Sequence, residues 1–393
     1  MLDLITEILL LLVVAIGLGQ LFNVFSMPEI VGAIIAGILL GPAVTGLISP
    51  SSELTTVSTL ALFFIILQIG IEASSDIFSK NIRYVTGFAV SSFVIPFVLM
   101  SLGSLLIFHL PYLEAISTSL SVSIPSISIS SVLLVRSGLI RMEDGLRLLG
   151  GVAMSDTLAF IILVSFHRPL VTIAIDSMSL AAFVVGLYFL DTFLKSKSDV
   201  LIGRFNRFTT RETEGIIFAV VILMGLAASV LFEYIGITFV LGAFFSGLII
   251  HQNSIGEHTF GILRRTFQRI NSSFFIPLFF SISGLEIALV PASVIPYLLF
   301  LIAVTTAIGG FAAYKFSTRF MKNIHPSVSL GIFGARGAVG IIIASLALSK
   351  GFISNTYYSV AVFATVMMAI AFTFVFERSL KRNGDLQLSS SSP

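Results

Sequence analysis

Asp156 is the residue whose position most directly indicates chemistry, because it lies inside the apolar stretch GGVAMSDTLAFIILV at residues 150–164. If a membrane span begins near residue 146, this carboxyl group lies about 15 Å deep, at about 1.5 Å of helix rise per residue. A charge at that depth costs on the order of 2.5–3.5 kcal/mol even on lenient insertion scales. Burial disfavours the ionised form, so a proton and a cation compete for this carboxylate. We favour a site for a monovalent cation; the alternative is a protonated aspartate that only joins helices.

Arg336 is the only basic residue inside an apolar stretch, and glycines surround it in GIFGARGAVG at residues 331–340. Its guanidinium either binds a substrate anion or is a fixed positive charge that holds backbone carbonyls or a distant acid. We favour the second role, because Glu72 and Glu286 lie at the ends of other apolar stretches and offer acidic partners.

The stretch at residues 112–135 is rich in serine and carries Pro125 at its centre. Proline removes a helical hydrogen bond, and clustered glycines weaken helix preference, so this stretch and the one around Arg336 both predict interrupted helices. Broken backbone at membrane depth is tolerated only where it lines a cavity or is buried in protein. Ser126, Ser128 and Ser130 follow the proline and are either cation ligands or helix-packing residues.

The composition places these residues in a membrane protein. The chain is 56% hydrophobic and only 11% charged, and its mean hydropathy is +1.06. Such values lie outside the range of soluble globular domains, and the apolar runs do not alternate as barrel strands do. We predict an all-α polytopic fold. About thirteen spans follow from the twenty-residue criterion, at residues 4–25, 28–48, 54–71, 83–108, 112–135, 146–167, 169–194, 214–234, 237–251, 270–289, 292–318, 327–349 and 354–377.

The basic residues predict the orientation of these spans. Of the 22 Lys and Arg residues, 19 follow odd-numbered spans or lie at their ends, including Arg264, Arg265 and Arg269 in a predicted loop before residue 270. Only Arg168 and Lys350 follow even-numbered spans. The positive-inside rule then predicts an external N-terminus and a cytoplasmic C-terminus in the cytoplasmic membrane.

Several other classes of protein find no support. The net charge is only +2 and the basic residues form no tract, which argues against nucleic-acid binding. The chain has no cysteine, which excludes disulfides and cysteine-ligated metals. It contains no HExxH, GxSxG or P-loop motif, so we expect neither an enzyme nor a bound cofactor. The N-terminus lacks a basic region and a cleavage site, so we interpret it as a retained first helix.

An internal repeat is also visible. The segment VGAIIAGIL at residues 31–39 matches LGAFFSGLI at 241–249 at both glycines, and residues 63–72 are echoed by residues 277–286. The members of each pair lie about seven predicted spans apart. Because seven is an odd number, the two copies would cross the membrane in opposite directions, as in inverted-repeat transporters. The alternative is chance similarity among helices rich in Gly, Ala and Leu. If the repeat holds, the two predicted interrupted helices are equivalent members of it.

An ordered set of motifs resembles the cation:proton antiporter superfamily, particularly the Kef-like and Nap-like bacterial and archaeal sodium or potassium/proton exchangers. The motifs are MPEIVGAIIAGILLGP, FFIILQIGIE, GITFVLGAFFSGLII, FFIPLFFSISGLEI and GARGAVGIIIASLALSKG, and they extend over nearly the whole chain. The resemblance implies the sodium/proton antiporter fold, with inverted-topology repeats and two crossing interrupted helices. It also implies a homodimer and elevator-like alternating access, in which one site binds either a cation or protons.

The resemblance further implies a division of the chain. We expect the dimerisation domain at 1–82 and 214–290, the core ion-translocation domain at 83–167 and 291–378, a linker helix and cytoplasmic loop at 168–213, and a short cytoplasmic tail at 379–393. The family's essential aspartate maps onto Asp156. Its unwound segment maps onto Pro125–Ser130, which includes Ile127.

The sequence departs from the family pattern at two informative places. Relatives carry a second acid or an asparagine before the aspartate, where this chain has Ser155. Electrogenic members carry a lysine where this chain has Thr306 or a close neighbour. We therefore expect electroneutral exchange of one Na⁺ or K⁺ for one proton, with Ser155 as an ion ligand and Thr306, Glu72 and Arg336 in electrostatic or structural roles in the core. The alternatives are a cation-coupled symporter, an organic-anion transporter, or a channel or sensor subunit.

Overall fold

Much of the chain, but not all of it, is described in the computed structural model. The described residues are 3–24, 27–73, 82–126, 130, 143–165, 210–234, 239–250, 256–320, 330–331, 333–334 and 336–390. The chain forms two compact units. Unit one comprises Met1–Leu54, Ile77–Leu163 and Phe280–Pro393, and unit two comprises Thr55–Asp76 and Val164–Phe279.

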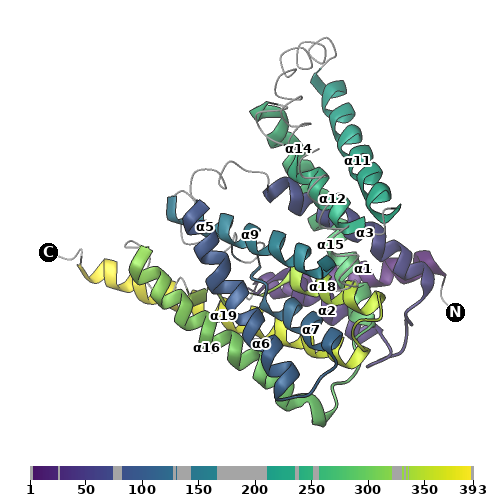
Figure 1. Ribbon diagram of the computed structural model, residues 1–393. Helices are drawn as coiled ribbons and strands as arrows, with labels where there is room; N and C mark the ends of the chain where they lie inside the picture. The colour runs from purple at the N-terminus through teal and green to yellow at the C-terminus, as the bar shows by residue number, and fades with distance from the viewer. Residues whose placement is uncertain are drawn as a thin grey trace. The chain divides into compact units, whose positions relative to one another are not determined.

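Unit one is built from helices (Figure 1). They are α1 (Leu4–Val24), α2 (Glu29–Leu40), α5 (Ile82–Ala89), the π-helix η1 (Val90–Val94), α6 (Ile95–Leu106), α7 (Tyr112–Ser123), α9 (Glu143–Ser165), the 3₁₀ helix η4 (Ala292–Val294), α16 (Ile295–Phe320), α18 (Ala338–Ser349) and α19 (Asn355–Ser390). Helix α7 packs against α6, α18 and α19, and α16 packs against α6 and α19. Helix α7 is therefore surrounded by protein, and the residues from Ala115 to Ser126 are all buried.

Unit two contains most of α3 (Ser52–Ala73), together with α11 (Thr210–Tyr234), α12 (Phe239–Leu248), α14 (Glu257–Ile270) and the π-helix η3 (Asn271–Phe275). Helix α15 (Ile276–Leu285) begins in this unit and ends in unit one. Helix α11 packs against α12 and α14.

The helical, membrane-spanning character predicted from composition is confirmed. Six of the described helical segments are long and apolar enough to cross a membrane, and α2 and α18 are shorter apolar helices. The protein is thus a multi-pass membrane protein. The count of about thirteen spans stays a prediction, because the span expected at 169–194 lies outside the described residues.

Two predicted boundaries were wrong. The second span was expected to reach residue 48, but α2 ends at Leu40, where Gly41 is extended and Pro42 follows. The basic loop expected before residue 270 is instead the helix α14, which continues without a break through η3 into α15. Phe260, Leu263 and Phe267 recur at helical spacing and are buried, so an apolar stripe folds this charged segment onto the protein.

The repeated glycines mark close helix crossings in both units. In unit one, a Cβ atom added to Gly37 of α2 would lie 2.7 Å from Cα of Gly284. In unit two, a Cβ added to Gly70 of α3 would lie 3.0 Å from Cα of Gly247 in α12. Gly37 matches Gly247 and Gly70 matches Gly284 in the sequence repeat, so each crossing joins one member from each half. This pairing supports the repeat.

The crossing at Gly247 makes a testable prediction about stability. A Cβ at this position would lie 2.8 Å from the backbone nitrogen of Ile71 and 3.0 Å from the carbonyl carbon of Gly70, so the helices must separate. We expect Gly247→Ala to lower the free energy of unfolding by about 1–3 kcal/mol. Thermal unfolding of the purified protein in detergent would measure this loss.

Gly17 of α1 is the matched control, because nothing lies within 4 Å of a Cβ added there. Alanine has the higher helix propensity, so Gly17→Ala should leave stability unchanged or raise it by up to about 1 kcal/mol. Equal unfolding temperatures for the two variants would contradict the close crossing at Gly247.

Candidate ion-binding site

Two interrupted helices meet in unit one. Helix α7 ends at Ser123, and Ile124 is extended, with φ −78° and ψ 124°. Pro125 then forms an isolated antiparallel β-bridge with Arg336. Gly337 is also extended, with φ −176° and ψ −136°, and α18 begins at Ala338. The backbone is thus non-helical at the two places where Pro125 and the glycines predict it to be.

The two helix ends at this crossing carry opposite partial charges. The last carbonyl groups of α7 have no partner within the helix, and the first N–H groups of α18 have none either. The end of α7 is therefore partly negative and the start of α18 partly positive. A Cβ atom added to Gly340 would collide with the carbonyl oxygen of Ser121, so only glycine allows α18 to approach α7 this closely.

Asp156 lies on α9 in the same compact unit and is only 1% exposed. Ser155 beside it is fully buried, and its hydroxyl donates a hydrogen bond of 3.0 Å to the carbonyl of Gly151. A hydroxyl that donates to its own helix keeps oxygen lone pairs that can accept or coordinate. The sequence-predicted aspartate is thus a buried carboxyl group with a buried hydroxyl as its neighbour.

The serines after Pro125 are buried where the structure describes them. Ser126 is 1% exposed and Ser130 is fully buried, and the Ser130 amide donates a 2.9 Å hydrogen bond to the Ser126 carbonyl. Within the described residues, the Ser130 hydroxyl has no hydrogen-bond partner. Buried hydroxyls are usually satisfied by protein, water or an ion, so this oxygen is available to a ligand. Ile127 and Ser128 lie outside the described residues.

Arg336 is fully buried and fixes the crossing through backbone carbonyls. Its Nη1 donates to the carbonyl of Phe333 at 2.9 Å, and its Nη2 donates to the carbonyl of Ser92 at 3.1 Å. No carboxylate within the described part of the chain makes a hydrogen bond with it, although Glu72 and Glu286 were considered as partners. These bonds agree with a structural cation that satisfies broken backbone.

Ser92 also belongs to this site through its carbonyl group, although it was not predicted from the sequence. It lies in η1, and Pro96 four residues later lacks the N–H that would bond the Ser92 carbonyl in a regular α-helix. The carbonyl is thus available to Arg336. The sequence does hold a signal, because each π-helix in the described residues ends just before an Ile-Pro pair, Ile95-Pro96 or Ile276-Pro277.

Two predicted core residues lie elsewhere. Thr306 is exposed on α16, whereas its neighbour Thr305 is fully buried and donates to the sulfur of Met100 at 3.4 Å. The prediction named Thr306 or a close neighbour, and the buried residue of the two is Thr305, because successive helical side chains differ by about 100° in direction. Glu72 belongs to unit two, where it accepts a 2.8 Å hydrogen bond from Gln68.

The role of Arg336 can be tested by Arg336→Lys. A lysine keeps the charge, but its compact ammonium cannot reach both carbonyls as the guanidinium fork does. The loss of one charged hydrogen bond should lower the free energy of unfolding by about 1.5–3 kcal/mol. Arg319→Lys at the exposed end of α16 should change it by less than about 0.5 kcal/mol. Denaturation in detergent compares them, and a fully stable Arg336→Lys would show that one carbonyl contact is dispensable.

Comparison with known proteins finds relatives over nearly the whole chain. The chain is 26% identical over 385 residues to a Na(+)/H(+) antiporter of Enterococcus hirae, covering 95% of this chain and 98% of the relative. It is 25% identical over 354 residues to the Na(+)/H(+)-K(+) antiporter GerN of Bacillus cereus, covering 89% of each. The structure of the sodium proton antiporter MjNhaP1 from Methanocaldococcus jannaschii superposes with a TM-score of 0.69 at 14% identity, over 98% of this chain and 97% of that one. This likeness shows the fold.

The family evidence covers almost the whole chain. The profile of the family described as "Sodium/hydrogen exchanger, transmembrane" matches residues 8–382. This range includes Asp156, both sides of the helix crossing and the repeated glycines. The chain therefore belongs to the transmembrane sodium/hydrogen exchanger family.

Proposed function

We propose that this protein exchanges a monovalent cation, Na⁺ or K⁺, for a proton across the cytoplasmic membrane. The observation that carries the proposal is a buried carboxyl group, Asp156, in the unit that also contains two interrupted helices with opposed end charges. A buried acid surrounded by protein can be neutralised by a proton or by a cation. Exchange of one for the other needs no further reactive group. The antiporter names of the relatives support the same assignment.

Asp156 supplies the charge of the proposed site. In the state open to the cytoplasm, Asp156 releases its proton and accepts the cation. Neutral oxygen ligands come from Ser155, from Ser126 and Ser130, and from the carbonyl groups at the end of α7. Sodium and potassium both prefer such oxygen ligands. Because proton and cation compete for one carboxylate, binding of either excludes the other, and exchange is obligatory without a separate gate.

Arg336 has a supporting role in this proposal. Its charge is held by the Phe333 and Ser92 carbonyls, so it fixes the crossing and stays in place while the ion changes. A fixed positive charge in the same unit also favours the ionised carboxylate when no cation is bound, and it repels a second cation. One carboxylate then binds one ion at a time.

Transport itself requires that the site be exposed to each side in turn. We propose that the core segments 83–167 and 291–378 carry the site across the membrane against the dimerisation segments 1–82 and 214–290 of a homodimer. Only the charge-neutralised carboxylate crosses, since a bare charge in the membrane is costly. The N-terminus is external in this arrangement and the C-terminus is cytoplasmic, as the distribution of basic residues favours.

We propose a stoichiometry of one cation for one proton. Ser155 stands where relatives carry a second acid or an asparagine, and Thr305, a buried residue on α16, is neutral. A site with a single titrating carboxylate exchanges equal charge in the two directions. The transport cycle is then electroneutral.

Asp156→Asn tests the site directly. Asparagine keeps the shape of the side chain but neither releases a proton nor neutralises a cation, so exchange should fall to the level of protein-free vesicles. Purified protein in vesicles with an internal pH-sensitive dye would report proton movement after pulses of Na⁺ or K⁺. Glu53→Gln, which removes an exposed acid at the start of α3, should leave exchange unchanged. Normal exchange by Asp156→Asn would rule out this mechanism.

The stoichiometry has its own test in the same vesicles. For one-for-one exchange, net flux stops when the cation ratio across the membrane equals the proton ratio, whatever the membrane potential. An imposed potential should therefore not move this reversal point. A reversal point that shifts with potential would show that unequal numbers of protons and cations are exchanged, while leaving the role of Asp156 intact.

A further inference from the structure

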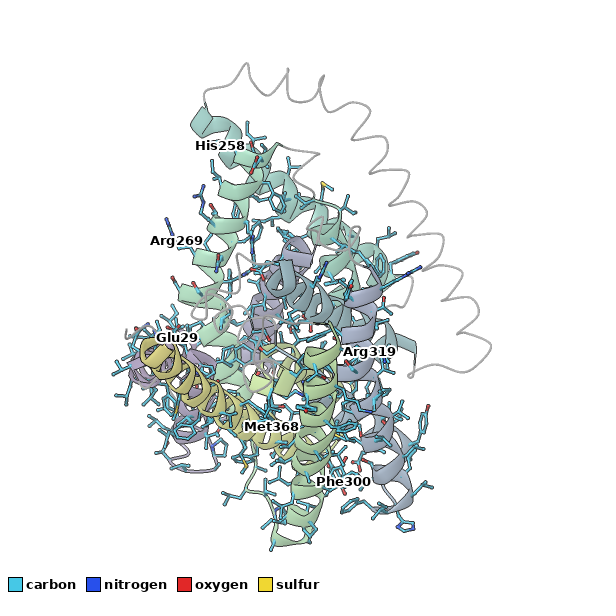
Figure 2. The ribbon with its side chains drawn as sticks, turned by 90° about the vertical axis from the view of Figure 1, so that its left-hand side faces the viewer. Glu29, His258, Arg269, Phe300, Arg319 and Met368 are labelled. Atoms are coloured by element: carbon cyan, nitrogen blue, oxygen red, sulfur yellow. The ribbon has the colours of Figure 1, made fainter. Side chains whose placement is uncertain are left out.

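Helix α14 in unit two has a basic face that the proposed transport cycle does not use. Phe260, Leu263 and Phe267 are buried on one side, and the Phe267 ring lies 4.7 Å from the ring of Phe218. Arg264, Arg265 and Arg269 are exposed. Figure 2 shows the labelled Arg269 side chain pointing outward from this helix. We propose that this face binds the headgroups of anionic phospholipids.

The height of the arginines along the helix matches the headgroup layer of a bilayer. Helix α14 continues through η3 into the apolar helix α15 as one helical segment. The proposal places α15 in the hydrocarbon and the charged α14 at its surface. At about 1.5 Å per residue, Arg264 and Arg269 are separated by about 7.5 Å along the axis. The headgroup region of one leaflet is about 5–7.5 Å thick. With α14 along the membrane normal, the three arginines fit within one headgroup layer.

Two of the three charges on this face, Arg265 and Arg269, are not neutralised by acidic groups in the described parts of the chain. Arg264 interacts electrostatically with Glu72. Arg265 and Arg269 form no salt bridge within the described parts of the chain, and the one side-chain hydrogen bond of Arg265 runs from Nε to the Gly261 carbonyl at 3.1 Å. They are four residues apart, so two like charges repel each other on one face, which destabilises a bare helix. A lipid phosphate between them removes this repulsion.

The geometry of the two side chains suits a phosphate. Guanidinium groups bind phosphate oxygens through two parallel hydrogen bonds, and Arg265 and Arg269 both retain their terminal nitrogens for this purpose. Ser272, one turn further toward the hydrocarbon, is exposed on the same face. In the proposed orientation this face lies on the cytoplasmic side, where membranes carry anionic lipid. The ligand is therefore an anionic phospholipid in that leaflet.

The test measures lipid binding and does not depend on ion transport. The whole purified protein is mixed with phosphatidylcholine and phosphatidylglycerol, and native mass spectrometry measures how strongly each is retained. Each arginine near an anionic surface contributes about a factor of five, so the double variant Arg265→Gln/Arg269→Gln should retain phosphatidylglycerol about 30-fold more weakly. Phosphatidylcholine retention should not change.

The control, Lys350→Gln, removes an exposed charge that the proposed orientation places on the opposite side of the membrane, and it should bind phosphatidylglycerol as the unmodified protein does. Equal weakening in this control and in the double variant would show a general charge effect and overturn the proposal, as would undiminished retention by Arg265→Gln/Arg269→Gln. Inorganic phosphate in place of lipid should not compete; strong competition would identify a site for soluble anions instead. The variant Arg265→Gln/Arg269→Gln should remain folded and still exchange ions. Weaker lipid binding in it is then not a consequence of lost transport.

Discussion

The need to satisfy broken backbone inside a membrane is the constraint on which the rest of unit one depends. Helices that stop at Ser123 and start at Ala338 leave carbonyl and N–H groups without helical partners, and lipid offers none. The buried guanidinium of Arg336 meets the same kind of need for two other carbonyls, that of Phe333 before the second break and that of Ser92 in η1. The burial of a permanent charge and the breaking of two helices are each costly alone. Together they compensate one another, because a cation needs carbonyl oxygens and free carbonyls need a donor.

The same logic extends to the elements around the crossing. Pro96 leaves the Ser92 carbonyl available, and the π-helix at Val90–Val94 lets the surrounding helix continue past it. Gly340 removes the side chain that would keep α18 away from α7, and Gly37 and Gly284 permit another close contact in the unit. Proline and glycine weaken an isolated helix. Here they lie where contacts with other helices replace the hydrogen bonds or side-chain packing that they remove.

The helix α14 illustrates the limit of charge as a guide to secondary structure. Arg264, Arg265 and Arg269 resemble a basic loop between two spans, and the positive-inside pattern takes them as markers of a membrane surface. The apolar residues Phe260, Leu263 and Phe267 nevertheless determine that the segment is a helix, because they are buried on one side. Their three- and four-residue spacing was visible in the sequence. Hydropathy averaged over twenty residues hides it, since the arginines cancel the apolar side chains.

The sequence by itself determined that this protein is a helical membrane protein, because composition does not depend on packing, and it singled out Asp156 as the predicted mid-membrane acid. It also located both helix interruptions, since Pro125 and the glycines around Arg336 act locally on the backbone. Only the tertiary structure decided what Arg336 contacts and which of Thr305 and Thr306 faces the protein interior. Both outcomes depend on how helices far apart in the chain are rotated and packed, and a rotation of one residue, about 100°, moves a side chain from the interior to the surface.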